Sequence, residues 1–305
     1  MNRGHVVLAL AWVPLLFAGS LACAAGQSAT LAHAKVARAH THRVRISADE
    51  PGVRSSAALV LDETHSSVLY SRRADVALPI ASITKLMTAL VVADAKQPLD
   101  EIVEISGEDR ISGKGAYSRL VVGTKLSRGE LIHLALMSSE NRAAHALARN
   151  YPGGMSAFVK AMNIKARELG MSSAHFVDPA GLSSENVASP EDLSKLVAAA
   201  AQNSTIRDYS TDEGYAVRVG RRMLEFRNTN PLVASPTWNI IVQKTGYTVE
   251  AGKCLVMQAV IEGRTVLIVL LNSVGKYTRV ADAARIRRWM EMTVTTGARG
   301  AANSI

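Results

Sequence analysis

The chain has 305 residues, of which 48% are hydrophobic, 20% are charged and 5% are aromatic, and these proportions exclude a disordered or fibrous protein. The formal net charge of +9 comes from scattered arginines and lysines, without zinc-finger spacing or an aromatic and basic nucleic-acid signature. The excess therefore predicts general surface charge, or attraction to an anionic polymer such as a cell wall, and no nucleic-acid partner.

The first 24 residues have the organisation of a secretory signal peptide. Arg3 supplies a positive charge, residues 6–17 are apolar, and Ala22-Cys23-Ala24 offers small side chains for cleavage. The apolar stretch is shorter than the roughly 20 residues of a membrane-spanning helix, which disfavours an uncleaved anchor. We therefore expect export to the periplasm. Cleavage would leave Cys254 as the single cysteine, so no intrachain disulfide is expected.

The remainder divides into three parts by composition. Residues 25–53 are rich in Ala, His, Arg and Ser without a sustained period, which predicts a flexible lead-in. His40 and His42 lie in this lead-in, and a pair without further ligands indicates solvated side chains rather than a metal site. One folded domain is expected over residues 54–293, followed by a disordered tail over 294–305.

The folded domain begins with a predicted hairpin. Ala57–Asp62 and Val68–Ser71 are short β-rich runs separated by five polar residues. A helix follows, because apolar residues recur at i, i+3, i+4, i+7 and i+8 from Ile83 and a proline, Pro79, stands just before the run.

Ser82 and Lys85 are three residues apart at the start of this helix, so their side chains are neighbours. Burial and the positive end of the helix dipole both favour a neutral lysine amine. A neutral amine beside a hydroxyl is a base that can make the serine nucleophilic. Ser273 and Lys276 have the same spacing, but no apolar helical run follows them, which predicts a loop.

A second polar group lies between two predicted helices. Ser127 and Glu130 form a capping box that opens the first helix, and an Ala-rich helix is expected over Arg142–Asn150. The intervening Ser139-Glu140-Asn141 therefore suits a loop aimed into a cleft. The same letters recur at Ser184-Glu185-Asn186, which we set aside because no helix leads into that stretch.

The C-terminal part contains three predicted strands and a helix. The strands are Trp238–Lys244, Cys254–Ile261 and Thr265–Leu271, with a turn at residues 262–264, and the helix covers Asp282–Met292. Strands at both ends of the domain, with helices between them, predict an α+β fold. Its antiparallel sheet is formed by the N- and C-terminal strands, with an inserted helical layer.

Lys244-Thr245-Gly246 is expected at the end of the first of these strands. A lysine in a strand is normally a surface residue. The glycine that follows favours a functional role, because a residue without Cβ lets a ligand approach the strand backbone.

Taken together, Ser-x-x-Lys, Ser-x-Asn and Lys-Thr-Gly in this order resemble the active site of the penicillin-binding proteins and serine β-lactamases. Wider segments such as LVLDETHSSVLYSRRADVALPIASITKLMTAL and HFVDPAGLSSENVASPEDL resemble the D-alanyl-D-alanine peptidases of family S11. LALMSSENRAAHALARNYPGG and FRNTN resemble the small endopeptidases of the penicillin-binding protein 7 type. The resemblance covers about residues 57–292 and implies a DD-peptidase fold.

The resemblance also implies roles for individual residues. Ser82 would be the nucleophile, Lys85 its base, and Ser139 a proton relay to the departing amine. Asn141 would bind the acyl part of the substrate. The charged amine of Lys244 and the hydroxyl of Thr245 would bind a carboxylate, Gly246 would let the substrate approach, and the N–H groups of Ser82 and Tyr247 would form the oxyanion hole. No metal or cofactor is implied.

The implied function is cleavage of D-alanine cross-links between peptidoglycan stem peptides in the periplasm, with β-lactams as covalent inhibitors. Two alternatives remain, namely a D-alanyl-D-alanine carboxypeptidase and a non-catalytic penicillin- or cell-wall-binding protein. No Glu-x-x-Leu-Asn string lies between Asn141 and Lys244, which disfavours a class A β-lactamase.

Overall fold

The computed structural model describes residues 50–64, 66–111 and 117–302, with only the backbone described from residue 294 onward. The predicted signal peptide and all but the last four residues of the predicted lead-in, including His40 and His42, lie outside the described residues.

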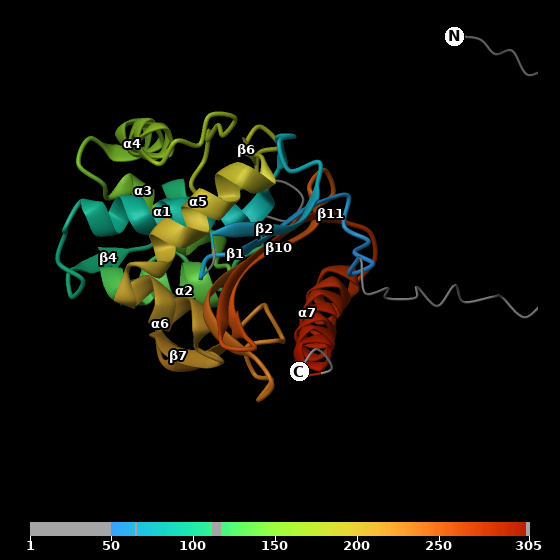
Figure 1. Cartoon of the computed structure of the whole chain (residues 1–305). Helices are drawn as coiled ribbons and strands as arrows, with labels where there is room; N and C mark the ends of the chain where they lie inside the picture. The colour runs from blue at the N-terminus through green and yellow to red at the C-terminus, as the bar shows by residue number, and fades with distance from the viewer. Residues whose placement is uncertain (1–49, 65, 112–116, 303–305) are drawn as a thin grey trace, which may run out of the picture. The chain divides into compact units, whose positions relative to one another are not determined.

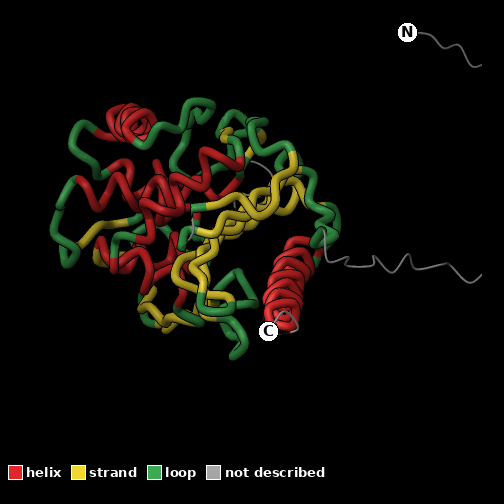
Figure 2. The backbone as a smooth tube through the Cα atoms, in the orientation of Figure 1, coloured by secondary structure: helices red, strands yellow, loops and turns green. Residues whose placement is uncertain are grey.

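A five-stranded antiparallel sheet forms the centre of the domain, with the strand order β2-β1-β11-β10-β9 (Figures 1 and 2). β1 pairs with β11, with Ala57 opposite Leu271, so strands from the two ends of the domain are neighbours. The predicted α+β architecture is confirmed. The strands are β1 (Ala57–Asp62), β2 (Ser67–Arg72), β9 (Asn239–Thr248), β10 (Gly252–Ile261) and β11 (Arg264–Ser273).

A two-residue turn joins β10 to β11. Glu262 and Gly263 have φ angles of 50° and 73°, as a type I′ hairpin turn requires at both central positions. The sequence predicts Arg264 in the turn, but Arg264 is the first residue of β11.

Both faces of the sheet are covered, which explains the long apolar runs in its strands. In β11, Leu267 and Leu271 pack into a large core beneath the helices, whereas Ile268 and Leu270 pack into a second cluster. That second cluster includes Ala283, Ile286, Trp289 and Met290 of α7 (Thr278–Ala302). Figure 1 shows α7 on the face of the sheet opposite the helical layer. Alternate side chains of a strand point to opposite faces, so each strand serves both cores.

The C-terminal helix is longer than the sequence predicts. α7 begins at Thr278 and continues to Ala302, through most of the predicted tail over 294–305. The apolar contacts of Trp289 and Met290 fix the middle of the helix against the sheet. Adding residues to an existing helix is far easier than starting one, which explains the extension over a stretch without an apolar stripe.

The helical layer covers the other face of the sheet and is inserted between β2 and β9. The capping box predicted at Ser127 is confirmed, because its side chain accepts from the N–H of Glu130 and its own N–H donates to the Glu130 carboxylate. The helices are α1 (Thr84–Asp94), α2 (Arg128–Met137), α3 (Asn141–Arg149), α4 (Gly154–Glu168), α5 (Pro190–Ala201) and α6 (Ser204–Thr211).

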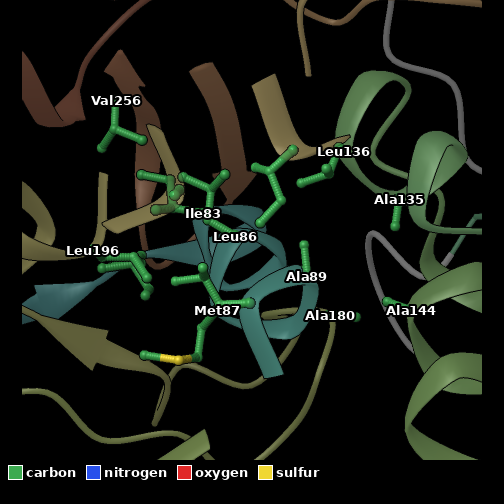
Figure 3. Packing of buried hydrophobic residues seen from close by; sticks show 14 of the residues in the cluster. Ile83, Leu86, Met87, Ala89, Ala135, Leu136, Ala144, Ala180, Leu196 and Val256 are labelled. Carbon is green, nitrogen blue, oxygen red and sulfur yellow. The ribbon is translucent and has the colours of Figure 1, made fainter. Parts of the chain in front are cut away.

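The core beneath this layer is centred on α1 (Figure 3). Ile83, Leu86, Met87, Leu90 and Val91 are all buried, so the predicted helical stripe is confirmed. Short strand pairs complete the layer: β3 (Leu78–Pro79) with β6 (Val187–Ala188), β4 (Ile102–Glu104) with β5 (Lys125–Ser127), and β7 (Gly214–Val219) with β8 (Arg222–Arg227).

Within the part of the chain that the structure describes, no helix combines the length and apolar character needed to cross a bilayer.

Candidate active site

Ser82 and Lys85 lie on the first turns of the central helix. A 3-10 turn, η1 (Ala81–Ile83), leads directly into α1. Ser82 is half-buried, whereas Lys85 is completely buried. Ala81 has a φ of 48°, in the left-handed region that residues with a Cβ rarely adopt. Backbone strain of this kind persists where the surrounding structure holds a functional group in place.

The amine of Lys85 contacts three oxygens from three separate parts of the chain. Its Nζ lies 2.8 Å from the hydroxyl of Ser82, 2.9 Å from Oδ1 of Asn141 and 2.7 Å from the carbonyl of Ala180. The side chain is therefore fixed in position and directed at the serine.

Burial lowers the pKa of Lys85 from 10.5 to about 7, although the negative charges of Asp178 and Glu140 act in the opposite direction. A neutral amine has two N–H donors and one lone pair. The carbonyl of Ala180 and Oδ1 of Asn141 can only accept hydrogen bonds, whereas the Ser82 hydroxyl can also donate. The three contacts therefore suit a neutral Lys85 whose lone pair accepts the proton of Ser82.

The carbonyl of Ala180 is presented by a tightly bonded loop. The carboxylate of Asp178 accepts from the N–H groups of Ala180, Gly181 and Ser183 at 2.6–2.8 Å. Gly181 has a φ of 77°, and a Cβ there would lie 1.9 Å from the carbonyl oxygen of Ala81. Only glycine permits this close approach.

Asn186 joins the same loop to α1. Its Oδ1 accepts from the N–H groups of Val177 and Asp178, and its Nδ2 donates to Thr84 at 3.1 Å and to the Asp178 carbonyl at 2.8 Å. Asn186 belongs to the Ser-Glu-Asn copy that we set aside. It is a scaffold residue of the site and does not contact Ser82 or Lys85 through a hydrogen bond.

The Ser139-Glu140-Asn141 group lies at the junction of α2 and α3. Ser139 adopts a φ of 62° between the two helices, and Asn141 is the first residue of α3 rather than part of the loop. Asn141 brings its Oδ1 to Lys85 and donates its Nδ2 to the carbonyl of Tyr117 at 3.3 Å. The hydroxyl of half-buried Ser139 has no hydrogen bond to Ser82 or Lys85 in this structure, so its role as a relay remains a prediction.

Glu140 anchors the segment that flanks this junction. Its carboxylate is buried and accepts hydrogen bonds from the Ser118 hydroxyl, from the N–H of Leu120 at 3.2 Å and from the N–H of Asn141 at 3.1 Å. Glu140 thereby holds residues 118–120 against the start of α3.

Lys244-Thr245-Gly246 lies inside β9, which continues to Thr248, rather than at the end of the strand. β9 is an edge strand of the sheet and packs against η1. A Cβ on Gly246 would lie 2.7 Å from the carbonyl oxygen of Ile80 and 3.3 Å from the backbone nitrogen of Ser82. The missing Cβ therefore lets β9 approach the nucleophile's own backbone.

Lys244 is fully buried, and its pKa is lowered well below 10.5 by burial, then by the charges of Lys85 and Arg279. Its Nζ donates to the carbonyl of Thr245 at 2.9 Å. Unlike Lys85, it has only cations among the charges that shift its pKa. This environment opposes the expectation that Lys244 is the charged lysine at rest, because charge on it is favoured only when an anion lies nearby.

Thr245 and Tyr247 of β9 each make one further side-chain contact. The hydroxyl of Thr245 lies 2.6 Å from that of Thr229. Tyr247 is about half exposed, and the amine of Lys253 lies 3.3 Å from the centre of its ring.

Comparison with known proteins assigns the chain to a family that fits this pairing of a serine and a lysine. Residues 44–275 match the family model of the D-alanyl-D-alanine carboxypeptidases, peptidase S11. The chain belongs to peptidase family S11.

This S11 peptidase is similar to two curated endopeptidases over most of its length. It is 50% identical over 252 residues to the D-alanyl-D-alanine endopeptidase of Pseudomonas aeruginosa, covering 82% of this chain and 81% of that protein. It is 47% identical over 246 residues to the D-alanyl-D-alanine endopeptidase of Escherichia coli K12, covering 80% and 79%. The crystal structure of the Streptomyces K15 DD-transpeptidase superposes with a TM-score of 0.73 at 30% identity, over 78% of this chain and 97% of that one. The resemblance predicted from the motifs is confirmed, and the chain is a serine-type hydrolase.

Several site residues of the S11 peptidase escaped the sequence analysis. Asp178, Ala180 and Gly181 carry a local signal, since Asp-Pro-x-Gly is typical of a tight turn closed by the aspartate side chain. Arg279 carries no such signal. It lies at the start of α7, donates to the carbonyl of Gly246 at 2.9 Å, and has a pKa lowered by burial.

Other residues with reactive side chains take structural positions. His133 is buried, stacks on Tyr209 and lies 2.9 Å from Asp212, while Cys254 is buried with its pKa raised by burial to about 11. Ser273 ends β11 and Lys276 lies in the following loop, so the second Ser-x-x-Lys pair is not helical, as predicted. Among the described residues, no group of three or more histidine, cysteine or acidic side chains is arranged to bind a metal ion.

Proposed function

We propose that this S11 peptidase is a serine D-alanyl-D-alanine endopeptidase that cleaves cross-links between peptidoglycan stem peptides through an acyl-enzyme. The observation that carries the proposal is the 2.8 Å contact between the Lys85 amine and the Ser82 hydroxyl, because it pairs a base with a nucleophile. The high identity to two proteins named endopeptidases favours the cross-link as the substrate.

In the acylation step, the oxygen of Ser82 attacks the carbonyl carbon of a D-alanine residue while its proton passes to Nζ of Lys85. General-base assistance of this kind typically contributes about 10²–10⁴-fold in rate. The tetrahedral intermediate then expels the amine of the second stem peptide, which takes up a proton relayed through Ser139. The acyl group remains esterified to Ser82 until water, deprotonated by the same base, releases it as a carboxylate.

The backbone N–H groups of Ser82 and Tyr247 are proposed to bind the oxyanion. The close packing of Gly246 on the backbone of Ser82 supports this arrangement, since it brings the following residue of β9 beside the nucleophile. Loss of one oxyanion donor generally costs about 10²–10³ in rate.

Lys244, Thr245 and Arg279 are proposed to bind the carboxylate of the residue that carries the leaving amine. Lys244 and Arg279 are cations whose pKa values burial lowers, and Arg279 contributes to the lowering at Lys244. An incoming carboxylate would raise the pKa of Lys244 and restore its charge. The substrate carboxylate therefore supplies the negative charge that balances the cations Lys244 and Arg279.

Asn141 is proposed to bind the acyl side of the substrate through its amide N–H while its Oδ1 holds Lys85. The contact of Oδ1 with Nζ supports the second part of this role and fixes the orientation of the amide.

A D-alanyl-D-alanine carboxypeptidase is the alternative activity, since the family is named for it. The membership of a serine hydrolase family and the complete hydrogen-bonded set of Ser82, Lys85 and Asn141 argue against the non-catalytic penicillin- or wall-binding protein that the sequence left open. The proposed location is the periplasm, reached through the signal peptide predicted at residues 1–24. The proposed partners are peptidoglycan and, as covalent inhibitors, β-lactams.

The test is to incubate the enzyme separately with a purified cross-linked muropeptide dimer and a monomeric pentapeptide, with Ser82→Ala as the control. The proposal predicts conversion of the dimer to monomers by the unaltered enzyme only. Release of D-alanine from the pentapeptide with no cleavage of the dimer would overturn the endopeptidase assignment in favour of the carboxypeptidase.

A further inference from the structure

A hollow of about 440 Å³ lies between the β7–β8 hairpin and the segment of residues 228–234. Its size falls within the roughly 300–1,000 Å³ of typical ligand pockets. Half-buried Tyr215 supplies aromatic surface, buried Phe226 also lines the hollow, and Arg227 and Asn230 supply polar groups. None of the residues assigned above to catalysis lines it among the described residues.

One wall of this hollow, residues 228–230, is hydrogen-bonded to β9 at and beside the Lys-Thr-Gly triplet. Thr229, between two residues that line the hollow, has its hydroxyl 2.6 Å from that of Thr245 and donates its N–H to Met137 at the end of α2. The side chain of Gln243 donates to Asn228 at 3.0 Å. Thr229 of this wall therefore contacts Thr245, the threonine proposed to bind the substrate carboxylate, directly.

The β7–β8 hairpin forms the other wall and contacts Arg119, which lies on the opposite side of the active site from β9. The guanidinium of Arg119 donates to the carbonyl of Glu225 at 2.7 Å and lies 3.7 Å from the centre of the Phe226 ring. Arg119 is two residues from Tyr117, whose carbonyl accepts from Asn141. Both walls of the hollow are thus bonded to segments that flank the active site.

Asn230 places an unpartnered donor in this wall. Its side chain is 1% exposed, and its Oδ1 accepts from the N–H of Leu232, but its Nδ2 has no hydrogen-bond partner. The neighbouring Asn228 differs, because its Nδ2 donates to the carbonyls of Ser210 and Asp212. A buried amide donor without a partner is unfavourable, and Asn230 is one of the residues that line the hollow.

Exposed charges of both signs line the hollow. Glu213 and Glu225 are carboxylates, and Arg227 is a guanidinium on the same hairpin region. A ligand with both carboxylate and amino groups is complementary to this lining.

We propose that the hollow binds the amine-side stem peptide of the cross-link, the peptide that leaves when Ser82 is acylated. This inference rests on the proposed endopeptidase function. The carboxylate held at Lys244 and Thr245 belongs to the diamino residue that carries the leaving amine, so the remainder of that peptide extends from Thr245. This remainder passes the hydroxyl of Thr229 and enters the hollow. There Asn230 and Arg227 bind carbonyl and carboxylate oxygens of the peptide.

The test compares two reactions of the full-length enzyme. One is kcat/KM for cleavage of a purified cross-linked muropeptide dimer, and the other is the second-order rate of acylation by benzylpenicillin, which has no amine-side peptide. Asn230→Asp keeps the acceptor for Leu232 but exchanges the N–H donor for a carboxylate oxygen, which repels a ligand carbonyl. Arg227→Ala removes the exposed guanidinium. Arg222→Ala is the matched control, an exposed arginine at the other end of β8 that does not line the hollow.

We expect the ratio of dimer cleavage to penicillin acylation to fall about tenfold in Asn230→Asp and at least about threefold in Arg227→Ala, and to stay constant in Arg222→Ala. An unchanged ratio in either of the first two variants, or an equal fall in the control, would overturn the subsite while leaving the endopeptidase function intact. Failure of the unaltered enzyme to cleave the dimer would overturn the proposed function and the subsite together.

Discussion

The amine of Lys85 lies 2.8 Å from the hydroxyl oxygen of Ser82, and its two other contacts are with oxygens that only accept hydrogen bonds. This geometry assigns the lone pair of a neutral lysine to the serine proton. An arginine cannot serve in this way, because it does not lose its proton in proteins.

Lys85→Arg should therefore lower the rate of acylation by a fluorescent penicillin by at least about 10²-fold while the protein remains folded. The measurement is the rate of label incorporation, with circular dichroism to check the fold. Lys276→Arg is the matched control, because it changes the lysine of the other Ser-x-x-Lys pair and should label at the normal rate. Normal labelling of Lys85→Arg would remove Lys85 from the role of base.

The acylation rate should depend on pH through Lys85. Its pKa is lowered to about 7, and the base is the unprotonated form, so the rate should rise roughly tenfold per pH unit below 7 and level off above it. Stopped-flow measurement of penicillin acylation between pH 5 and 9 checks the profile. A rate that still rises steeply between pH 8 and 9 would show that the base keeps an ordinary lysine pKa.

Asp178→Asn should move this profile toward lower pH. The charge of Asp178 raises the pKa of Lys85, so its removal lowers that pKa and leaves a larger neutral fraction at acidic pH. The midpoint of the acylation profile is the quantity to compare between the variant and the unaltered enzyme. A midpoint displaced to higher pH would contradict the electrostatic account of the loop.

Gly246→Ala should lower acylation by about 10²–10³-fold, the cost typical of losing an oxyanion donor. The new Cβ would lie 2.7 Å from the carbonyl of Ile80, so β9 must move away from the backbone of Ser82. Gly107→Ala is the control, because a Cβ there would meet nothing within 4 Å. Equal acylation rates in the two variants would show that close packing of β9 on Ser82 does not matter for the reaction.

The sequence predicts those parts of the molecule that depend on local patterns. The stripe from Ile83 to Val91 predicts a buried helix because its spacing matches one helical face, and the capping box at Ser127 predicts the start of α2. The pairing of β1 with β11 follows from strands at both ends of the domain.

The remaining features depend on contacts between distant residues. Lys244 is inside β9 because β10 pairs with this strand as far as Thr248, which the pattern at residues 238–244 does not show. The carbonyl of Ala180 reaches Lys85 only because Asp178, Gly181 and Asn186 close a loop over α1. Contacts of this kind join residues that are far apart in the chain, so no periodic pattern in the sequence predicts them.

Arg279 is the clearest omission, because it belongs to a helix that packs on the opposite face of the sheet. Its guanidinium reaches Gly246 from the first turn of α7, 33 residues further along the chain. Nothing in the spacing of basic residues distinguishes it from the arginines that follow it in the same helix.

The central claim is that Ser82 is acylated with the help of Lys85. Its most direct test is peptide mapping by mass spectrometry after reaction with benzylpenicillin, using the unaltered enzyme, Ser82→Ala and Lys85→Arg. We predict one stoichiometric adduct on the peptide that contains Ser82, no adduct in Ser82→Ala and, at the same reaction time, almost none in Lys85→Arg. An adduct on Ser139 or another residue, or one that persists in Ser82→Ala, would contradict the account.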